Sequence, residues 1–345
     1  MADVNDLLNL LPPSPDLVPI PSAEFPNYFF LYHGRHFPLY RHPPDRRNDP
    51  QFDPQVQLPS VLPIDRYDMV RRTVLHNLVN LCLGHRNWFG PFEQHITPPE
   101  GKLVIDVGSD NGRWIEEVSD EFPHSIHFRG IEIFPSSPTE AANNNVRFEV
   151  YDFQRERIRH GDASVDVVHA RFQNFHIIDW DAFLKDVARC LKPGGLFMSG
   201  ELDISLEYPG GQAGNATATI QLYDQVQRIM IQRGYTPDIG TRMVGILNGM
   251  RNSAGDPLFT NVGWGVHPFP MSANNAHNPN VDEREISALS MEYLDKLAKS
   301  LRPFLLSTGQ AQIEVDGLLQ QHRRELRAMC AKMTYRVAWA ERTRA

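Results

Sequence analysis

The chain has 345 residues, a formal net charge of −8 and three widely spaced cysteines. This acidic balance argues against a broad basic face for nucleic acid, and no apolar run reaches the length of a membrane span. Because the sequence has neither a CxxC pair nor an HExxH motif, we expect no disulfide framework and no metal site. Acids and prolines fill the first twenty residues, where a secretory signal needs basic and then apolar residues. We therefore expect a cytoplasmic protein, with the nucleus left open.

Residues 1–60 are rich in proline, and we expect them to form an N-terminal arm or lid. The aromatic residues within 25–40 are too many for a free tail, so this part is expected to pack onto the core. Apolar positions then recur at helical spacing over residues 64–84. Asp65 is the expected N-cap of this helix, and Gly84 is its expected end.

From residue 103 the pattern alternates between short apolar strands and amphipathic helices, which predicts a parallel sheet with crossover connections. The expected strands are 103–108, 126–133, 146–153, 165–172 and 196–204, with a closing strand at 333–342. The expected helices are 113–123, 179–195, 217–234, 282–307 and 311–331. Residues 61–345 thus form one predicted domain.

Glycine, proline and asparagine are concentrated in parts of residues 205–290. Long loops of this composition often carry function. We therefore expect this insertion to shape a substrate pocket, with Trp264 and Met271 as apolar walls.

The stretch VIDVGSDNGRW at 104–114 places an acid and two glycines where the first strand meets a helix. Ligands of such sheets bind at the carboxyl ends of the strands. Gly108 permits a tight turn and Gly112 a close helix start, with Ser109 between them. Asp110 stands where a dinucleotide site has its middle glycine, and Asp106 and Asp110 together would repel a pyrophosphate. The pattern predicts a cationic, phosphate-free nucleoside, for which S-adenosylmethionine is suited.

The ends of the next two strands carry further acids. Glu132, followed by Ile133, can accept hydrogen bonds from ribose hydroxyls. Asp152 can accept from an adenine amino group, while Tyr151 or Phe153 offers a ring face. Each acid taken alone could equally be a turn or cap residue, but the three in succession favour a nucleoside site. Trp114 is expected to pack, with its N–H near the pocket.

These segments, with HARFQNFHIIDW and CLKPGG further on, resemble the class I S-adenosylmethionine-dependent methyltransferases. Within that class they are most similar to the fungal branch that contains the secondary-metabolism regulator LaeA and small-molecule methyltransferases. The resemblance covers about residues 28–345. It implies a Rossmann-like α/β fold with a mostly parallel seven-stranded sheet and helices on both faces. The cofactor would be S-adenosylmethionine.

By position, the resemblance also implies that Arg171 and Phe172 border the sulfonium. The chain departs from the family at Asp110, where a glycine is common, and at Glu132, where aspartate is common. Phe37 and Pro38 replace a tyrosine and a histidine in the arm. Since a ring face attracts a sulfonium, Tyr40 is our expected arm contact to the cofactor.

Methyl transfer from a sulfonium needs alignment of two reactants and, for some acceptors, a base. His176 and His76 are the candidate bases, although either could instead cap or pack. His169 lies inside a predicted strand, so we expect a structural role for it.

Three functions remain open from the sequence. The first is methylation of a small metabolite at oxygen or nitrogen, in secondary metabolism. The second is regulation through protein partners by a methyltransferase fold of the LaeA kind. The third, a nicotinamide-dependent oxidoreductase, is disfavoured by Asp110. We expect a small-molecule acceptor, no nucleic acid and no membrane, and leave open a homodimer or a protein partner.

Overall fold

The computed structural model describes residues 20–39, 60–135, 144–208, 216–272 and 280–344. Its centre is a seven-stranded sheet in the order β5-β4-β3-β6-β7-β9-β8. The first five strands in this order run parallel, and β9 pairs antiparallel with both β7 and β8. The strands are β3 (Leu103–Val107), β4 (His127–Glu132), β5 (Val146–Val150), β6 (Val165–Arg171), β7 (Leu191–Glu207), β8 (Phe259–Ser272) and β9 (Cys330–Arg342). The prediction of a mostly parallel seven-stranded sheet is confirmed.

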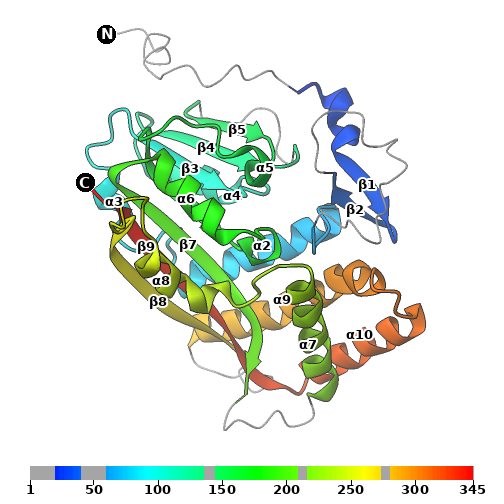
Figure 1. The fold of residues 1–345 in the computed structure, drawn as a ribbon. Helices are drawn as coiled ribbons and strands as arrows, with labels where there is room; N and C mark the ends of the chain where they lie inside the picture. The colour runs from blue at the N-terminus through cyan, green and yellow to red at the C-terminus, as the bar shows by residue number, and fades with distance from the viewer. Residues whose placement is uncertain (1–19, 40–59, 136–143, 209–215, 273–279, 345) are drawn as a thin grey trace.

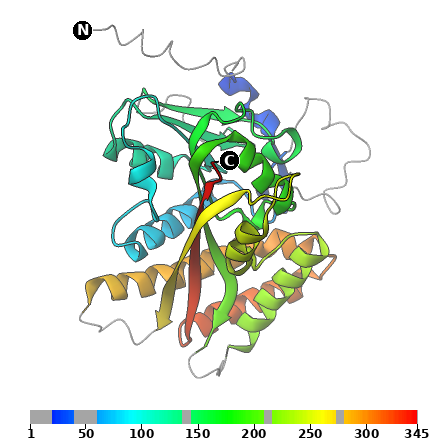
Figure 2. The same cartoon turned by 60° about the vertical axis from the view of Figure 1, so that its left-hand side comes forward.

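Helices cover both faces of this sheet (Figures 1 and 2). They are α2 (Arg66–Cys82), α3 (Phe92–His95), α4 (Arg113–Glu121), α5 (Phe153–Glu156), α6 (Trp180–Cys190), α7 (Thr217–Gln232), α8 (Ile239–Gly249), α9 (Val281–Leu306) and α10 (Gln312–Leu326). Successive strand residues face opposite sides, so the strands contribute to two cores. Val104 joins a core with α2, α4 and α9, whereas Ile105 joins one with α6 and α8. Within the described ranges, no helix combines the length and apolar composition that a bilayer crossing requires.

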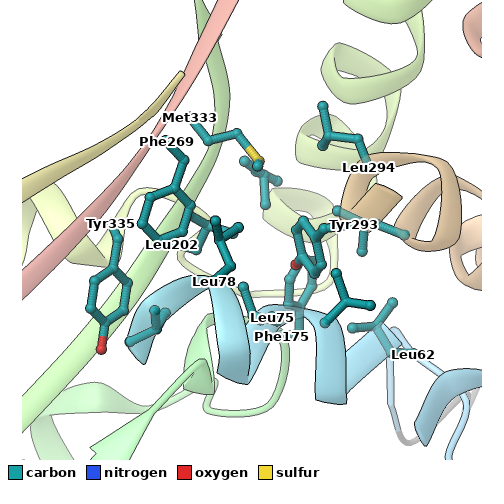
Figure 3. Packing of buried hydrophobic residues seen from close by; sticks show 14 of the residues in the cluster. Leu62, Leu75, Leu78, Phe175, Leu202, Phe269, Tyr293, Leu294, Met333 and Tyr335 are labelled. Atoms are coloured by element: carbon teal, nitrogen blue, oxygen red, sulfur yellow. The ribbon is translucent and has the colours of Figure 1, made fainter. Parts of the chain in front are cut away.

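The larger core lies between α2, α9 and the long strands β7, β8 and β9. Figure 3 shows Leu75 and Leu78 pointing from α2 towards Leu202 of β7, with Tyr293 of α9 beside them. All four side chains are buried. Since deleting a buried leucine side chain costs about 2–5 kcal/mol, this packing fixes α2 firmly against the sheet.

Side-chain caps explain where two of the predicted helices begin. The Asp65 carboxylate accepts hydrogen bonds from the backbone N–H groups of Tyr67 and Asp68 at the start of α2. Asp179 accepts from the backbone of Ala182 at the start of α6. Both caps satisfy N–H groups that have no partner within the helix, and the cap at Asp65 was predicted from the sequence.

The described part of the N-terminal arm forms a helical turn, η1 (Ser22–Tyr28), and a hairpin of β1 (Phe29–Tyr32) and β2 (Arg35–Pro38). The side chain of Phe37, on β2 of this hairpin, is fully buried. Arg35 binds both carboxylate oxygens of Asp65, at 2.5 and 2.9 Å, and so connects the hairpin to α2. The expectation that the aromatics pack the arm onto the domain agrees with this arrangement.

Two predicted helix ends are wrong. The helix expected to reach Gly195 ends at Cys190, and β7 begins at Leu191, because the residue before a proline avoids helical conformation and Pro193 follows Lys192. The helix expected to reach residue 331 ends at Leu326. Cys330, which the prediction placed inside this helix, is instead the first residue of β9 and pairs with Ser272 of β8. Strand pairing therefore overrides the helical pattern at this end.

Within residues 205–281, α7 agrees with the helix predicted at 217–234, whereas α8 and the edge strand β8 were not predicted. Pro268 and Pro270 are compatible with β8 because an edge strand leaves one row of backbone groups unpaired. Trp264 and Met271, which were expected to form pocket walls, therefore lie in the regular strand β8. The remaining parts of this segment, 209–215 and 273–279, lie outside the described residues.

Candidate active site

A pocket opens at the carboxyl ends of β3, β4, β6 and β7. Here the chain order reverses, because β4 lies on one side of β3 and β6 on the other, and ligands of open α/β sheets bind at such a point. The pocket has about 1030 Å³ of space, part of it open to solvent. At its β4 end lie Glu132, Ile133, Phe134, Phe153 and Gln154, and at its β7 end lie Leu75, His76, Arg171, Phe172, Phe175, Leu202 and Tyr293. Asp106, Gly108 and Ser109 stand between these two ends.

The turn after β3 has three residues in the left-handed region. The φ angles are 70° at Gly108, 56° at Asp110 and 77° at Gly112. Glycine is favoured at position 108 by its positive φ, and a Cβ there would also lie 2.1 Å from the side-chain nitrogen of Gln173, so the Gln173 side chain would have to move. Aspartate tolerates this region better than most residues, which explains how Asp110 can replace a glycine here.

Asp106 ends β3 as a buried acid that faces the pocket. His169 of β6 lies with its Nδ1 2.7 Å from Asp106 Oδ1, and its ring stacks on Trp114 at 3.6 Å. Burial lowers the pKa of His169, so the neutral ring donates to the carboxylate. The structural role expected for His169 thus agrees with its surroundings. Trp114 packs as expected, but its indole N–H donates to the backbone oxygen of Asn87, and Trp114 does not line the pocket.

Glu132 lies at the end of β4 with both carboxylate oxygens accepting backbone hydrogen bonds. Oε2 accepts from Asp110 N at 2.9 Å and Oε1 from Ile133 N at 2.7 Å. Burial raises the pKa of Glu132 to about 7, against the opposing effect of the Ile133 hydrogen bond. This acid therefore changes its charge near neutral pH while it fixes the glycine-rich turn.

The end of β5 differs from the prediction. Asp152 caps α5, accepting from the backbone of Gln154 and Arg155, and does not line the pocket. The Tyr151 hydroxyl accepts from Arg159 N at 3.1 Å, and Tyr151 also lies outside the lining. Phe153 lines the pocket as expected, and Gln154, which the prediction omitted, lies beside it. Gly112 begins α4 without lining the pocket, and Tyr40 lies outside the described residues.

The turn after β6 carries Arg171 and Phe172 into the pocket, as the resemblance implies. Phe172 has a φ of 59°, an uncommon value for an aromatic residue. Glu201 of β7 stabilises this turn by accepting hydrogen bonds from Gln173 N at 3.0 Å and Asn174 N at 3.1 Å. Burial raises the pKa of Glu201 to about 8 even though these two hydrogen bonds favour its charged form.

The two candidate bases differ in their surroundings. His76 has both ring nitrogens engaged: Arg171 Nη2 donates to Nδ1 at 2.7 Å, and Nε2 lies 2.8 Å from Glu117 Oε2. Burial and Arg171 lower the pKa of His76 to about 4, so it is neutral and its basic nitrogen is occupied. This arrangement counts against His76 as a base. His176 lines the pocket and is also neutral, because burial and the nearby Arg72 lower its pKa to about 3.

Residues 86–233 match a family profile described as a methyltransferase domain. This segment of the chain is therefore similar to methyltransferase domains. Methyltransferase pytC of Aspergillus terreus is 29% identical over 165 residues, covering 48% of this chain and 42% of that protein. Secondary metabolism regulator laeA of Coprinopsis cinerea is 32% identical over 148 residues, covering 42% of this chain and 36% of that protein. The matched segments thus span less than half the length of these two relatives.

A solved structure with a similar arrangement is phosphoethanolamine N-methyltransferase 2 of Haemonchus contortus, in complex with phosphomonomethylethanolamine and S-adenosylhomocysteine. The identity is 15%, with 81% of this chain and 59% of that chain covered and a TM-score of 0.39. The fold of the described residues is the Rossmann-like class I fold that the sequence predicted.

The prediction missed two arginines, Arg71 and Arg72, that line the pocket from α2. Arg71 binds both oxygens of Asp68, at 2.7 and 3.0 Å. Arg72 binds Asp68 at 2.6 Å and also pairs with Asp110 of the glycine-rich turn. An acid three and four residues before two arginines on a helix is a recognisable pattern, and it could have indicated this network.

The walls predicted from residues 205–290 are not supported. Met271 is buried, Trp264 is 62% exposed, and neither lines the pocket. None of the described residues between 205 and 290 belongs to the lining, whereas Leu202 and Tyr293 just outside that range do. In the part of the chain that the structure describes, His, Cys, Asp and Glu side chains form no cluster of three or more that could hold a metal ion.

Proposed function

We propose that this protein transfers a methyl group from S-adenosylmethionine to a small metabolite, at oxygen or nitrogen, as part of secondary metabolism. The observation that carries the proposal is one pocket with two chemically different ends. The β4 end combines the Glu132 carboxyl with aromatic rings, the glycine-rich turn and Asp106 lie in the middle, and apolar side chains form much of the β7 end. Such a pocket suits a polar nucleoside beside an organic acceptor.

The residues between the two ends suit the methionine part of the cofactor. Asp106 presents a buried carboxylate to an ammonium group. Ser109 Oγ is buried at the pocket and, among the described residues, has no hydrogen-bond partner. A buried hydroxyl without a partner is costly, so a ligand that bonds to it is favoured. At the β4 end, Glu132 retains lone pairs for ribose hydroxyls and Phe153 offers a ring to adenine.

The same residues disfavour a dinucleotide. Asp106 and Asp110 lie at the end of β3 and in the turn that follows it, where a dinucleotide places its pyrophosphate. Carboxylates at that place would repel the phosphates. This arrangement argues against the oxidoreductase alternative.

When bound, the sulfonium supplies a methyl group that is already activated for displacement. The protein then has to align the acceptor and exclude water, and alignment alone can contribute on the order of 7–11 kcal/mol. Leu75, Leu202 and Tyr293 supply an apolar wall at the β7 end. Phe172, held by the Glu201 contacts below its turn, narrows the pocket there.

A regulatory role through protein partners is the second candidate. It is favoured by Trp264 and Val266, which are 62% and 43% exposed on the edge strand β8. An exposed apolar pair on an edge strand is a typical place for a partner to bind.

The test is incubation of the protein with trideuteromethyl-labelled S-adenosylmethionine and a fungal metabolite extract, followed by mass spectrometry. We expect a labelled small molecule that is absent when sinefungin, a donor analogue, is added. Calorimetry on the same sample measures donor binding. Absence of donor binding would refute the proposal. Donor binding without any labelled metabolite would favour the regulatory role.

A further inference from the structure

Arg171 differs from the other arginines that line the pocket. Arg71 and Arg72 pair with Asp68, and Arg113 pairs with Glu117 at 2.7 Å. For Arg171, no carboxylate of the described residues lies within ion-pair distance. Its side chain donates a hydrogen bond from Nη2 to His76 Nδ1, its guanidinium carbon lies 5.4 Å from the centroid of the Phe172 ring, and it lines the pocket.

A guanidinium in this position calls for an anion. Burial lowers the pKa of Arg171, although Tyr335, Asp106 and Glu117 oppose this effect without forming an ion pair with it, and an arginine stays charged in a protein. A charge that is removed from water without a partner is unfavourable, and it is stabilised when a ligand supplies the opposite charge. The planar guanidinium has five N–H donors, and its geometry matches a carboxylate.

The surroundings of Arg171 hold it in place for such a ligand. Glu117 Oε2 accepts from Asn87 and lies 2.8 Å from His76 Nε2. That contact leaves the lone pair of His76 Nδ1 to accept from Arg171. His76 is therefore a positioning residue for Arg171, which explains why it is not available as a base.

The position of Arg171 assigns it to the acceptor rather than to the donor's cation. A guanidinium beside a sulfonium would repel it, so the role that the resemblance gave Arg171 is electrostatically unfavourable. Arg171 pairs with Gly200 of β7 and lies at the β7 end, beside the apolar wall formed by Leu75 and Leu202. An organic acid fits this combination of one cation and an apolar wall.

We propose, resting on the function proposed above, that the acceptor is a carboxylic acid, that Arg171 binds its carboxylate, and that the product is the methyl ester. One carboxylate oxygen stays on the guanidinium while the other forms a bond to the methyl carbon. The bond from that carbon to sulfur breaks, and its electron pair remains on sulfur. No proton moves, because the acid is already ionised.

A reaction in which no proton moves agrees with the surroundings of the two pocket histidines. His76 is engaged on both nitrogens, and the low pKa of His176 makes it a weak base. Phenols and amines need a base to release their proton at neutral pH, whereas a carboxylate does not. An ionised acceptor is therefore the one that the described residues are equipped to methylate.

The first test measures binding, with S-adenosylhomocysteine present, of a library of aromatic and aliphatic carboxylic acids and their matched primary amides. We expect the wild-type protein to bind at least one acid in preference to its amide. Arg171→Met should weaken that acid by roughly 10- to 100-fold and leave the amide unchanged, while Arg171→Lys retains part of the preference. Arg113→Met is the matched control, because that arginine also lines the pocket but is paired with Glu117, and it should keep the preference for the acid.

The outcomes separate the two proposals. Failure of the wild-type protein to bind S-adenosylhomocysteine refutes the methyltransferase function itself. Normal binding of S-adenosylhomocysteine with no acid preferred over its amide overturns only the assignment of the acceptor. A loss of S-adenosylhomocysteine affinity in Arg171→Met as large as the loss for the acid also overturns it, since Arg171 would then hold the cofactor's own carboxylate.

The second test examines the product. The preferred acid is incubated with labelled S-adenosylmethionine, and the labelled product is treated with mild alkali. A methyl ester is hydrolysed and loses its label, whereas an ether or N-methyl group keeps it. A label that resists alkali would overturn the proposal.

Discussion

The two ends of the pocket are built in different ways. At the β4 end, Glu132 acts through backbone hydrogen bonds, one of them to the glycine-rich turn after β3, whose left-handed residues lie close together in the sequence. At the β7 end, the lining side chains come from α2, β6, β7 and α9. The first end suits a constant ligand, because its contacts are fixed by a local turn. The second end can vary residue by residue, which suits a ligand that differs between related proteins.

The largest effect is expected from Asp106→Asn. The amide retains a hydrogen-bonding group for His169 but loses the charge that would attract the ammonium of the donor. We expect S-adenosylmethionine affinity to fall by roughly 100-fold, as for a lost hydrogen bond to a charged group. Isothermal titration calorimetry measures this directly.

Asp166→Asn is the matched control for that change. Asp166 is a buried acid on the neighbouring strand β6, where it pairs with Lys102 and Lys192 away from the pocket. Its substitution should lower thermal stability and leave donor affinity unchanged. Equal losses of affinity in the two variants would mean that Asp106 acts on the fold and not on the ligand.

A smaller effect is expected from pH through Glu132. Its pKa is raised to about 7, so the carboxyl is protonated below that pH and its attraction for a cationic ligand is lost there. Donor affinity should therefore fall by about tenfold between pH 8 and pH 6. In Glu132→Gln this part of the pH dependence should disappear, while any titration of the ligand itself remains in both proteins. Parallel pH profiles for the two proteins would contradict the role of Glu132.

The same contrast explains what could be predicted from the sequence. Asp106, Gly108, Glu132 and Phe153 line the pocket as predicted, because an acid or a ring at the end of an apolar strand is a local signal, and glycine after the first strand strengthens it. Asp152 shows the limit of that signal, since the same pattern also describes an N-cap, and its carboxylate caps α5. The sheet followed from strand alternation in the same way, whereas β8 was missed because glycines and prolines are also typical of loops.

The β7 end had no comparable signal. Tyr293 meets the pocket from a helix more than a hundred residues after Arg171, and only tertiary packing brings the two together. The engagement of His76 by Arg171 likewise depends on the position of α2 against the sheet. The residues that make these contacts follow no fixed spacing in the sequence, so no sequence pattern indicates them.

A modest effect on stability is expected at the β7 end from Glu201→Gln. The pKa of Glu201 in the folded protein is raised to about 8 by burial, above its ordinary value of 4.5. The folded state thus holds a proton that the unfolded state has already lost, so the stability of the wild-type protein should decrease as pH rises from 4.5 to 8. The variant lacks this loss and should gain about 1–3 kcal/mol relative to wild type between pH 6 and pH 9. Urea denaturation at the two pH values measures it, and a difference that does not change with pH would contradict the assignment.

The smallest effect is expected from Arg35→Gln, which tests whether the N-terminal hairpin belongs to the pocket. Arg35 and Asp65 form a partly buried ion pair with two hydrogen bonds, and Pro38 at the end of the hairpin lines the pocket. Breaking the pair should cost about 0.5–1 kcal/mol of stability, and proteolysis should cut the hairpin sooner. Asp65→Asn serves as the companion variant, because it removes the charge and retains an oxygen that can cap α2. If both variants leave donor affinity intact but weaken acceptor binding, the hairpin contributes to the β7 end; if they weaken donor affinity, it covers the β4 end instead.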